Sequence, residues 1–243
     1  MRYLVISDIH SNLLALNAVI ADAGSFDRIW CLGDITGYGP NPNECIARLR
    51  EFPLTTLAGN HDWAVLGLLS LTDFNQDARA ACVWTRQHLS AENKEYLSTL
   101  PVMLEEDGYT LVHASPSEPV EEYVLDPLSA EYNFDKFNTP VCLLGHSHWP
   151  IAFMQPPNST GLCVQIRPAY FQPLYFNGGK WIINPGSVGQ PRDGNPDASY
   201  ALLDVDEGRW EYRRVAYPVD ETQRRMKQHR LPERLIQRLL HGH

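Results

Sequence analysis

Gly59-Asn60-His61-Asp62 is the stretch on which the fold and the chemistry of this chain depend. It follows residues 53–58, an apolar run typical of a β-strand, so an amide, an imidazole and a carboxylate stand together where a strand ends. Similar clusters follow four other apolar runs: Asp8-Ile9-His10, Gly33-Asp34, His113 and Gly145-His146-Ser147-His148. Side chains of these types at several strand ends indicate metal ligands gathered at one edge of a sheet.

The composition sets the scale of the molecule and excludes one class of partner. A chain of 243 residues can bury a large core, and we expect one domain over residues 1–243 with a helical tail at 218–243. The net charge of −9 gives no general attraction to a polyanionic duplex. A small molecule is therefore expected as the substrate rather than a long nucleic acid.

Cysteine usage and the amino-terminal residues predict a cellular location. The five cysteines are widely spread without a C-x-x-C pair, which predicts buried free thiols in a reducing cytosol. The chain begins with a strand-like run, residues 3–6, and lacks the basic start of a signal peptide. Residues 64–71 are apolar but too few to span a bilayer. We expect a cytoplasmic protein with no membrane partner.

The first sixty residues alternate between strands and helices. In order, they are expected at residues 3–7, 13–23, 27–32, 42–51 and 53–58. Ser11-Asn12 and Asn41 stand where helix caps belong. The β-α-β-α-β order implies a parallel sheet with right-handed crossovers, and ligands of such sheets gather at the carboxyl ends of the strands.

The rest of the chain combines helices with antiparallel strands. Residues 62–100 are expected to be mainly helical, with caps at Asn75 or Asp77 and at Ser90, and residues 63–71 favour a core helix over a substrate lid. Asp107-Gly108, Gly178-Gly179 and Glu207-Gly208 predict hairpin turns. Strands are expected at residues 103–106, 109–112, 141–144, 151–154, 162–166, 181–184, 200–205 and 210–216, with a helix at 126–137.

The tail from Pro218 holds six Lys or Arg residues against three Asp or Glu residues. Apolar residues recur in it at helical spacing: Leu231, Leu235, Ile236, Leu239 and Leu240. This pattern favours a docked amphipathic helix with a solvated basic face over a phosphate-binding arm.

The clusters suit a two-metal hydrolytic site. Two cations about 3.5–4 Å apart can generate a hydroxide at neutral pH and offset phosphoryl charge. Asp8 and His10, like His146 and His148, are two residues apart, which places both on one side of an extended chain end. Each residue also has a plainer explanation: Asp8 could cap the next helix, and His113 could be an ordinary buried histidine.

Together, the five clusters resemble those of the calcineurin-like metallophosphoesterase superfamily, and Asn184 to Arg192 resembles a segment of its small bacterial and archaeal phosphodiesterases. The resemblance implies an α/β fold, a four-layer α/β/β/α sandwich, with one metal held by Asp8, His10, Asp34 and His148. A second metal would be held by Asp34, Asn60, His113 and His146. His61 would be a non-ligand catalytic histidine that stabilises the phosphoryl group or protonates the leaving oxygen; its alternative is a merely supporting hydrogen-bonding role.

One block departs from the pattern of the family's protein phosphatases, which carry G-D-x-x-D-R-G. Here Gly33 to Gly39 reads GDITGYG, without the aspartate that orients the catalytic histidine and without the phosphate-binding arginine. Asp62 is a candidate partner for His61, or the cap of the next helix. Arg192 is a candidate phosphate contact, or a structural arginine.

The sequence thus predicts a phosphoesterase with two divalent metal ions, manganese first and iron, zinc, nickel or cobalt as alternatives. Small phosphodiesters are the expected substrates, attacked by a metal-bridging hydroxide. The alternatives are a dinucleoside polyphosphate hydrolase, a nuclease, or a non-catalytic scaffold of the same fold. The sequence does not determine the oligomeric state.

Overall fold

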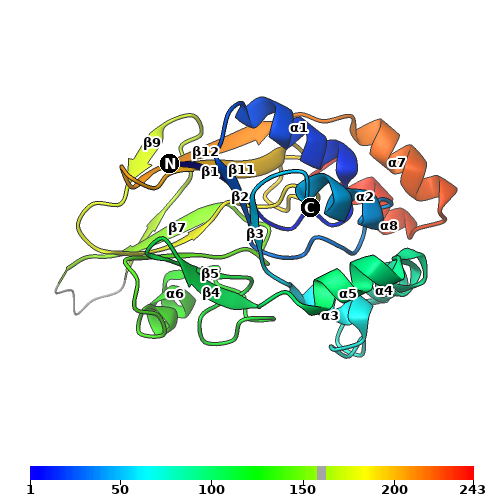
Figure 1. Cartoon of the computed structure of the whole chain (residues 1–243), viewed down its shortest axis with the longest axis horizontal. Coiled ribbons are helices and arrows are strands. Elements are labelled where there is room, and N and C mark those ends of the chain that lie inside the picture. Colours follow the sequence, from blue (N-terminus) through cyan, green and yellow to red (C-terminus); the bar gives the residue numbers. More distant parts are fainter. Residues whose placement is uncertain (158–162) are drawn as a thin grey trace.

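The computed structural model describes residues 1–157 and 163–243, and it contains two six-stranded sheets stacked face to face with helices outside them (Figure 1). This is the four-layer α/β/β/α arrangement that the sequence predicted. The first sheet has the spatial order β3 (Leu54–Thr56), β2 (Arg28–Cys31), β1 (Arg2–Ile6), β11 (Ala198–Asp204), β12 (Arg209–Val215) and β9 (Pro173–Tyr175). The second has the order β4 (Met103–Glu106), β5 (Tyr109–Val112), β6 (Val141–Leu143), β10 (Lys180–Asn184), β7 (Ile151–Gln155) and β8 (Val164–Ile166).

Strand β1 is apolar along its whole buried length because both of its faces are covered. Tyr3 and Val5 belong to the core between the two sheets, whereas Leu4 and Ile6 pack under the helices α1 (Leu13–Ala23) and α2 (Pro42–Leu49). Strands buried on both faces read as continuous apolar runs. β1, β2 and β3 are parallel, as the β-α-β-α-β pattern predicted.

The end of the chain completes the sheet that β1 begins. β11 pairs antiparallel with β1, so that Leu4 lies opposite Leu202, and β12 follows β11 after the predicted turn at Glu207-Gly208. The late antiparallel strands therefore do not form a separate sheet. They are divided between the two sheets, and β5, β6 and β10 are parallel neighbours in the second.

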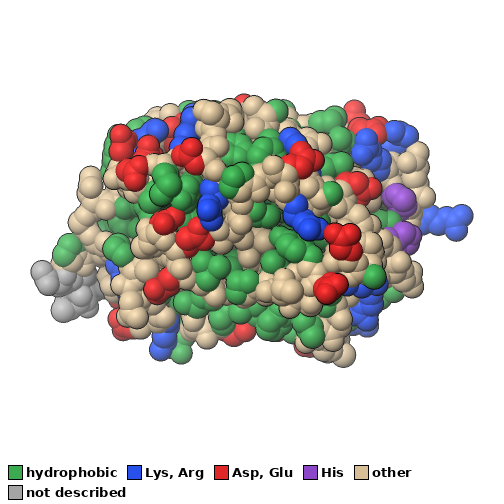
Figure 2. Space-filling view, viewed as in Figure 1, with side chains coloured by type: hydrophobic (Ala, Val, Ile, Leu, Met, Phe, Trp, Pro, Cys, Tyr) green, Lys and Arg blue, Asp and Glu red, His purple; other side chains and the backbone are tan. Residues whose placement is uncertain are grey.

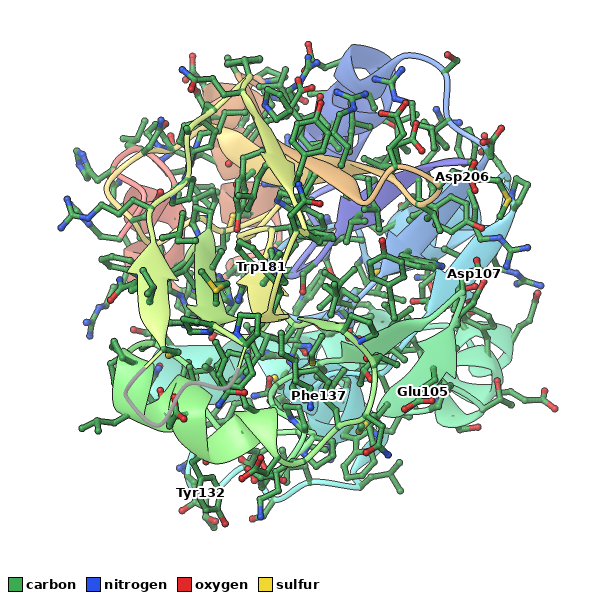
Figure 3. All side chains as sticks on the ribbon, turned by 90° about the vertical axis from the view of Figure 1, so that its left-hand side faces the viewer. Glu105, Asp107, Tyr132, Phe137, Trp181 and Asp206 are labelled. Carbon is green, nitrogen blue, oxygen red and sulfur yellow. The ribbon has the colours of Figure 1, made fainter. Side chains whose placement is uncertain are left out.

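Aromatic side chains fill the space between the sheets. Trp30 and Trp210 are fully buried there, and Trp181 is almost so. Figure 3 shows Trp181 in the layer between the two sheets. At the edge of this layer, the hydroxyl of Tyr3 donates to the Asp107 carboxylate at 2.7 Å, which joins β1 to the β4–β5 hairpin. The outer face of the second sheet is covered by α6 (Pro127–Phe134).

Two strand expectations differ from the structure. Gly178-Gly179 does not form a hairpin turn, because it connects β9 of the first sheet to β10 of the second. β9 itself was not predicted; it has only three residues and begins with a proline. Of the strand expected at residues 162–166, residue 162 lies outside the described residues, and β8 accounts for the last three.

The helical segment after β3 is more broken than expected. α3 (Asn60–Leu66) ends at Gly67, whose φ of 83° terminates the helix, so residues 63–71 do not form one core helix, and Leu68 is 62% exposed. α4 (Gln76–His88) is capped by the Asn75 side chain, and α5 (Ala91–Ser98) by that of Ser90. α6 also ends three residues earlier than predicted.

The tail contains two short helices, α7 (Val219–Gln228) and α8 (Glu233–Arg238). Its apolar residues, Leu235 and Leu239 among them, pack with Tyr38 and with α4. All five cysteines are buried and unpaired, as predicted. Within residues 1–157 and 163–243, no helix combines the length and apolarity that crossing a membrane requires.

Candidate metal centre

The residues predicted as ligands converge where the carboxyl ends of strands from both sheets meet. Asp8 and Asp34 follow β1 and β2, Asn60 begins α3 after β3, and His113 directly follows β5. His10 lies in the same loop as Asp8, while His146 and His148 follow β6. Except for Asn60, at 8% exposure, none of the seven is more than 5% exposed.

The first group consists of Asp8, His10 and His148. The Nε2 atoms of His10 and His148 lie 3.8 and 3.3 Å from Asp8 Oδ1. The same two nitrogen atoms are 3.0 Å apart. These separations suit atoms that share one cation, because two ligands about 2.1 Å from a metal lie roughly 3–3.5 Å from each other.

The second group contains Asp34, His113 and His146, whose ligand atoms lie within 4.8 Å of one another. Asp34 Oδ1 lies 3.6 Å from His113 Nε2, while its Oδ2 lies 3.6 Å from His10 Nε2 of the first group. Asn60 joins the second group through its amide oxygen, 3.3 Å from His113 Nε2. Asp34 therefore stands between the two groups with one oxygen facing each.

Backbone carbonyls orient the four imidazoles. One ring nitrogen of each lies against a carbonyl oxygen: Thr36 for His10, Leu32 for His113, Glu121 for His146 and Gln190 for His148. A carbonyl only accepts, so that nitrogen carries the proton and the other keeps its lone pair. The Nε2 atoms of His10 and His148 consequently face each other as two lone pairs, an arrangement that a cation between them would stabilise.

Two buried carboxylate oxygens show that this group of residues fits cations. Asp8 Oδ1 and Asp34 Oδ2 accept no hydrogen bond from the described residues. Burial raises the pKa of Asp8 to about 7 and that of Asp34 well above its usual 3.8. Burial also holds the pKa values of His10, His146 and His148 well below 6.5. Unpartnered carboxylates among neutral imidazoles are a donor set for manganese, iron or zinc.

The backbone at these positions differs from the extended geometry that the sequence suggested. Asp8, His10, Asp34, His146 and His148 all have positive φ values, between 47° and 62°. Asp8 and His10, like His146 and His148, come together because the backbone passes through the left-handed region after the strand. The alternation of side chains along an extended chain is not the cause. Such conformations cost of order 1–3 kcal/mol each in non-glycine residues, and they concentrate at functional sites.

Two glycines make close approach possible around the carboxylates. A Cβ on Gly59 would overlap the Asp34 carboxylate, and one on Gly145 would overlap the Ser7 hydroxyl. Gly59 has an extended backbone, so the requirement there is space rather than an unusual φ.

His61 lies beside these groups and lines a cavity of about 200 Å³ together with Asn60, His146 and Tyr38. It also lies close enough to His10 and Asp34 to form a third possible cluster of ligands. Its Nδ1 is 3.4 Å from the Sγ of Cys82, on α4. Burial raises the pKa of the Cys82 thiol to about 12, so the thiol keeps its proton at neutral pH. If the thiol donates to Nδ1, the proton of a neutral His61 ring lies on Nε2.

The Asp62 carboxylate bonds to backbone and hydroxyl groups rather than to the His61 ring, which decides between the alternatives that the sequence left open. Its carboxylate accepts from the backbone of Ile35, Thr36 and Gly59 and from the Thr36 hydroxyl, at 2.8–3.2 Å. It caps α3 and fixes the loop that carries Asp34. Cys82 is a hydrogen-bond partner of His61 that sequence reasoning missed, and no motif around it signals that role.

Arg192 does not line the cavity beside His61. Its Nη2 donates to the Tyr38 hydroxyl at 3.3 Å and to Gln190 Oε1 at 3.2 Å, and it lines a neighbouring cavity. These contacts do not decide between the two alternatives for Arg192, a contact of the reacting phosphate and a structural arginine.

Comparison with known proteins places this site in a family. The model of the calcineurin-like phosphoesterase superfamily domain matches residues 1–208. The uncharacterized protein MJ0912 of Methanocaldococcus jannaschii is 41% identical over 98% of this chain and 97% of its own length. The crystal structure of a metallophosphoesterase from Sphaerobacter thermophilus is 45% identical, with a TM-score of 0.92 over 100% of this chain and 99% of that one. A symmetrical bis(5'-nucleosyl)-tetraphosphatase of Aromatoleum aromaticum is 30% identical over 47% of this chain and 44% of its own. This chain belongs to the calcineurin-like phosphoesterase superfamily.

Proposed function

We propose that this protein is a phosphodiesterase that hydrolyses small phosphodiesters with two divalent metal ions, manganese being the first choice. The observation that carries the proposal is the pair of buried carboxylate oxygens, Asp8 Oδ1 and Asp34 Oδ2, that have no hydrogen-bond partner among the described residues and lie 3.3–3.8 Å from the Nε2 atoms of His10 and His148. Cations bound there would stabilise such an arrangement, because unpaired buried charge is costly.

The proposed ligands divide into two sets that share one carboxylate. One cation would be held by Asp8, His10, Asp34 and His148, and the other by Asp34, Asn60, His113 and His146. When bound, the two ions would supply a hydroxide nucleophile at neutral pH and compensate the negative charge of the phosphoryl oxygens. Because each imidazole is already oriented by a backbone carbonyl, little rearrangement is needed for binding.

His61 would act on the substrate rather than on the metals. It lines the cavity, and a hydrogen bond donated by the Cys82 thiol to Nδ1 would place the ring proton on Nε2. Burial keeps its pKa well below 6.5, so the ring is neutral at pH 7. A neutral His61 would donate a hydrogen bond from Nε2 to a phosphoryl oxygen or to the departing alcohol oxygen. That interaction strengthens as negative charge develops on the oxygen.

A dinucleoside polyphosphate is the second candidate substrate. The Aromatoleum relative carries the name of a bis(5'-nucleosyl)-tetraphosphatase, and its matched segment covers about half of this chain. A nuclease has no comparable support, because the net charge is −9. A non-catalytic scaffold would have no need to keep every one of the seven ligand residues and His61.

The proposal is tested by metal analysis and by hydrolysis of bis(p-nitrophenyl) phosphate with added manganese. We expect two bound ions per chain. Asp34→Asn should lose bound metal and turnover, and His61→Ala should keep its metal but lose about 10²-fold or more in kcat. The matched controls are Asp220→Asn and His229→Ala, both exposed on the tail. Wild-type protein without bound metal, or unchanged turnover in both site variants, would show the proposal to be wrong.

A further inference from the structure

A second cavity of about 200 Å³ adjoins the one beside His61, and three side chains line both: Tyr38, Asn75 and Tyr123. The wall of this second cavity includes three arginines, Arg192, Arg234 and Arg238, and a single carboxylate, that of Asp77. We refer to it as the arginine cavity. It lies next to the candidate metal centre but contains none of the proposed ligands.

The arginine cavity is built from distant parts of the chain. Arg192 lies in the loop after β10, whereas Arg234 and Arg238 are four residues apart in α8 and so share one face of that helix. The apolar face of α8 is held in place by Leu235 and Leu239, which pack with Tyr38 and α4. Figure 2 shows Lys and Arg side chains gathering at the end of the molecule formed by α7 and α8.

The charges in the arginine cavity are not balanced by the protein. Among the described residues, no Asp or Glu side chain forms an ion pair with any of the three guanidinium groups, although Arg238 Nε donates to the main-chain oxygen of His243, the last residue of the sequence. The buried Nε of Arg192 has no hydrogen-bond partner among the residues that the structure describes. Burial lowers the pKa of Arg238 to about 10, and the neighbouring Arg192 adds repulsion. Three arginines against the one carboxylate of Asp77 leave an excess of positive charge, which favours the binding of an anion.

We propose that the arginine cavity binds a second phosphate group of the substrate while the scissile phosphoester occupies the metal centre. The proposal rests on the proposed function and narrows its substrate class to phosphoesters that carry a further phosphate. Arginine suits this role because its planar guanidinium donates two parallel hydrogen bonds to phosphate oxygens. The three side chains that line both cavities place the two phosphates in neighbouring cavities.

The test compares two substrates that differ only in the second phosphate. They are the 5'-(p-nitrophenyl phosphate) of thymidine and the same ester with a 3'-phosphate. In Arg234→Gln, whose parent side chain is exposed and tolerates replacement, we expect KM for the 3'-phosphorylated ester to rise about tenfold. The kinetics of the plain ester should stay within twofold of wild type. An equal effect on both esters, or no effect on either, would overturn the proposal.

Matched variants separate the local charge from general effects. Arg224→Gln removes one positive charge from α7, where Arg224 pairs with Glu221 outside the cavity, and should leave both esters unaffected. Arg238→Lys keeps the charge but loses the planar fork, and we expect an intermediate rise in KM. Arg238 also donates to the backbone carbonyl of His243, so a thermal melt accompanies this variant.

A binding measurement distinguishes failure of this proposal from failure of the proposed function. Calorimetric titration with inorganic pyrophosphate measures binding and needs no turnover. Binding of pyrophosphate at the metal centre would be the same in all variants, so a difference between variants reports the arginine cavity. We expect Kd to weaken at least fivefold in Arg234→Gln and not in Arg224→Gln. If neither ester is hydrolysed but this difference is present, the anion site stands and the hydrolytic function fails. An unchanged Kd in Arg234→Gln rejects the anion site.

Discussion

Asp8, in the candidate metal centre, has an unusual backbone conformation and a buried carboxylate with one unpartnered oxygen. Its backbone has a φ of 53°, its Oδ2 accepts from the backbone of His146 at 3.1 Å, and its Oδ1 has no partner among the described residues. Burial, the largest influence on the carboxyl, raises its pKa to about 7. Asp8 is therefore placed for a cation at the expense of the stability of the metal-free fold.

This cost predicts that Asp8→Asn makes the metal-free protein more stable, by an amount that depends on pH. The unfolded Asp8 releases its proton near pH 3.8, whereas the folded one keeps it up to about pH 7. Folding is therefore disfavoured increasingly from about pH 4 to 7, by at most about 1.4 kcal/mol per pH unit, and asparagine has no such dependence. In EDTA, Asp8→Asn should exceed wild type in stability by a margin that grows over this pH range, as urea unfolding would measure.

Manganese should reverse that order, because only wild type keeps the Asp8 carboxylate as a ligand. Asp220→Asn, exposed on α7, is the matched control and should show no growing margin. A wild-type advantage over Asp8→Asn in EDTA at pH 7 would contradict the account of Asp8 as a buried, unbalanced acid.

The sequence located the seven clustered residues but could not assign Asp62 or Cys82. Carboxylates and imidazoles at strand ends are recognisable because parallel strands bring their carboxyl ends to one edge. Asp62, by contrast, binds backbone groups 26 and 27 residues earlier in the chain. Cys82 reaches His61 only through the packing of α4 on α3. Neither contact follows from local spacing.

At the scale of elements, Asp62 connects the start of α3 to the loop after β2. Asp62→Ala would leave the backbone N–H groups of Ile35, Thr36 and Gly59 without their acceptor, at about 1–3 kcal/mol for each buried donor. We expect a loss of about 3 kcal/mol in the free energy of unfolding. Metal affinity should also fall by tenfold or more, because this loop carries Asp34 and contacts of this kind support ligand orientation.

Urea unfolding and a manganese titration would measure the two effects. Asp126→Ala is the matched control, since Asp126 caps α6 through two backbone N–H groups on the far side of the second sheet. It should cost about 1 kcal/mol and leave metal affinity unchanged. If Asp62→Ala binds manganese as wild type does, the loop does not depend on Asp62.

Local patterns predicted most elements but not their sheet membership. The turn at Asp107-Gly108 was recognisable because Asp-Gly readily adopts positive φ, here 50° and 81°, between the two strands of a hairpin. Gly178-Gly179 has the same turn chemistry but connects the two sheets. The difference lies in the pairing of β9 with β12, more than thirty residues away. Hydrophobic periodicity carries no information about that partner.

Across the whole molecule, the candidate centre joins the two sheets. Asp8, His10 and Asp34 come from the first sheet, while His113, His146 and His148 come from the second. Backbone bonds strengthen the same junction, because Val188 and Gly189, after β10, donate to Ser7 and Asp8 after β1. Cations held from both sides would therefore oppose separation of the sheets as well as local opening of a loop.

Removal of metal should consequently lower global stability. A cation present at a free concentration of 100 times its Kd adds about 2.7 kcal/mol per site to the free energy of unfolding when it binds only the folded state. With EDTA, we expect the urea midpoint to fall with little change in the m-value, because the same surface becomes exposed on unfolding. Tryptophan fluorescence would follow the transition, since Trp30, Trp181 and Trp210 all lie between the sheets. Asp34→Asn should show no response to EDTA, because its shared carboxylate is missing. A wild-type midpoint that is equally high in EDTA and in manganese would mean that the centre does not hold the sheets together.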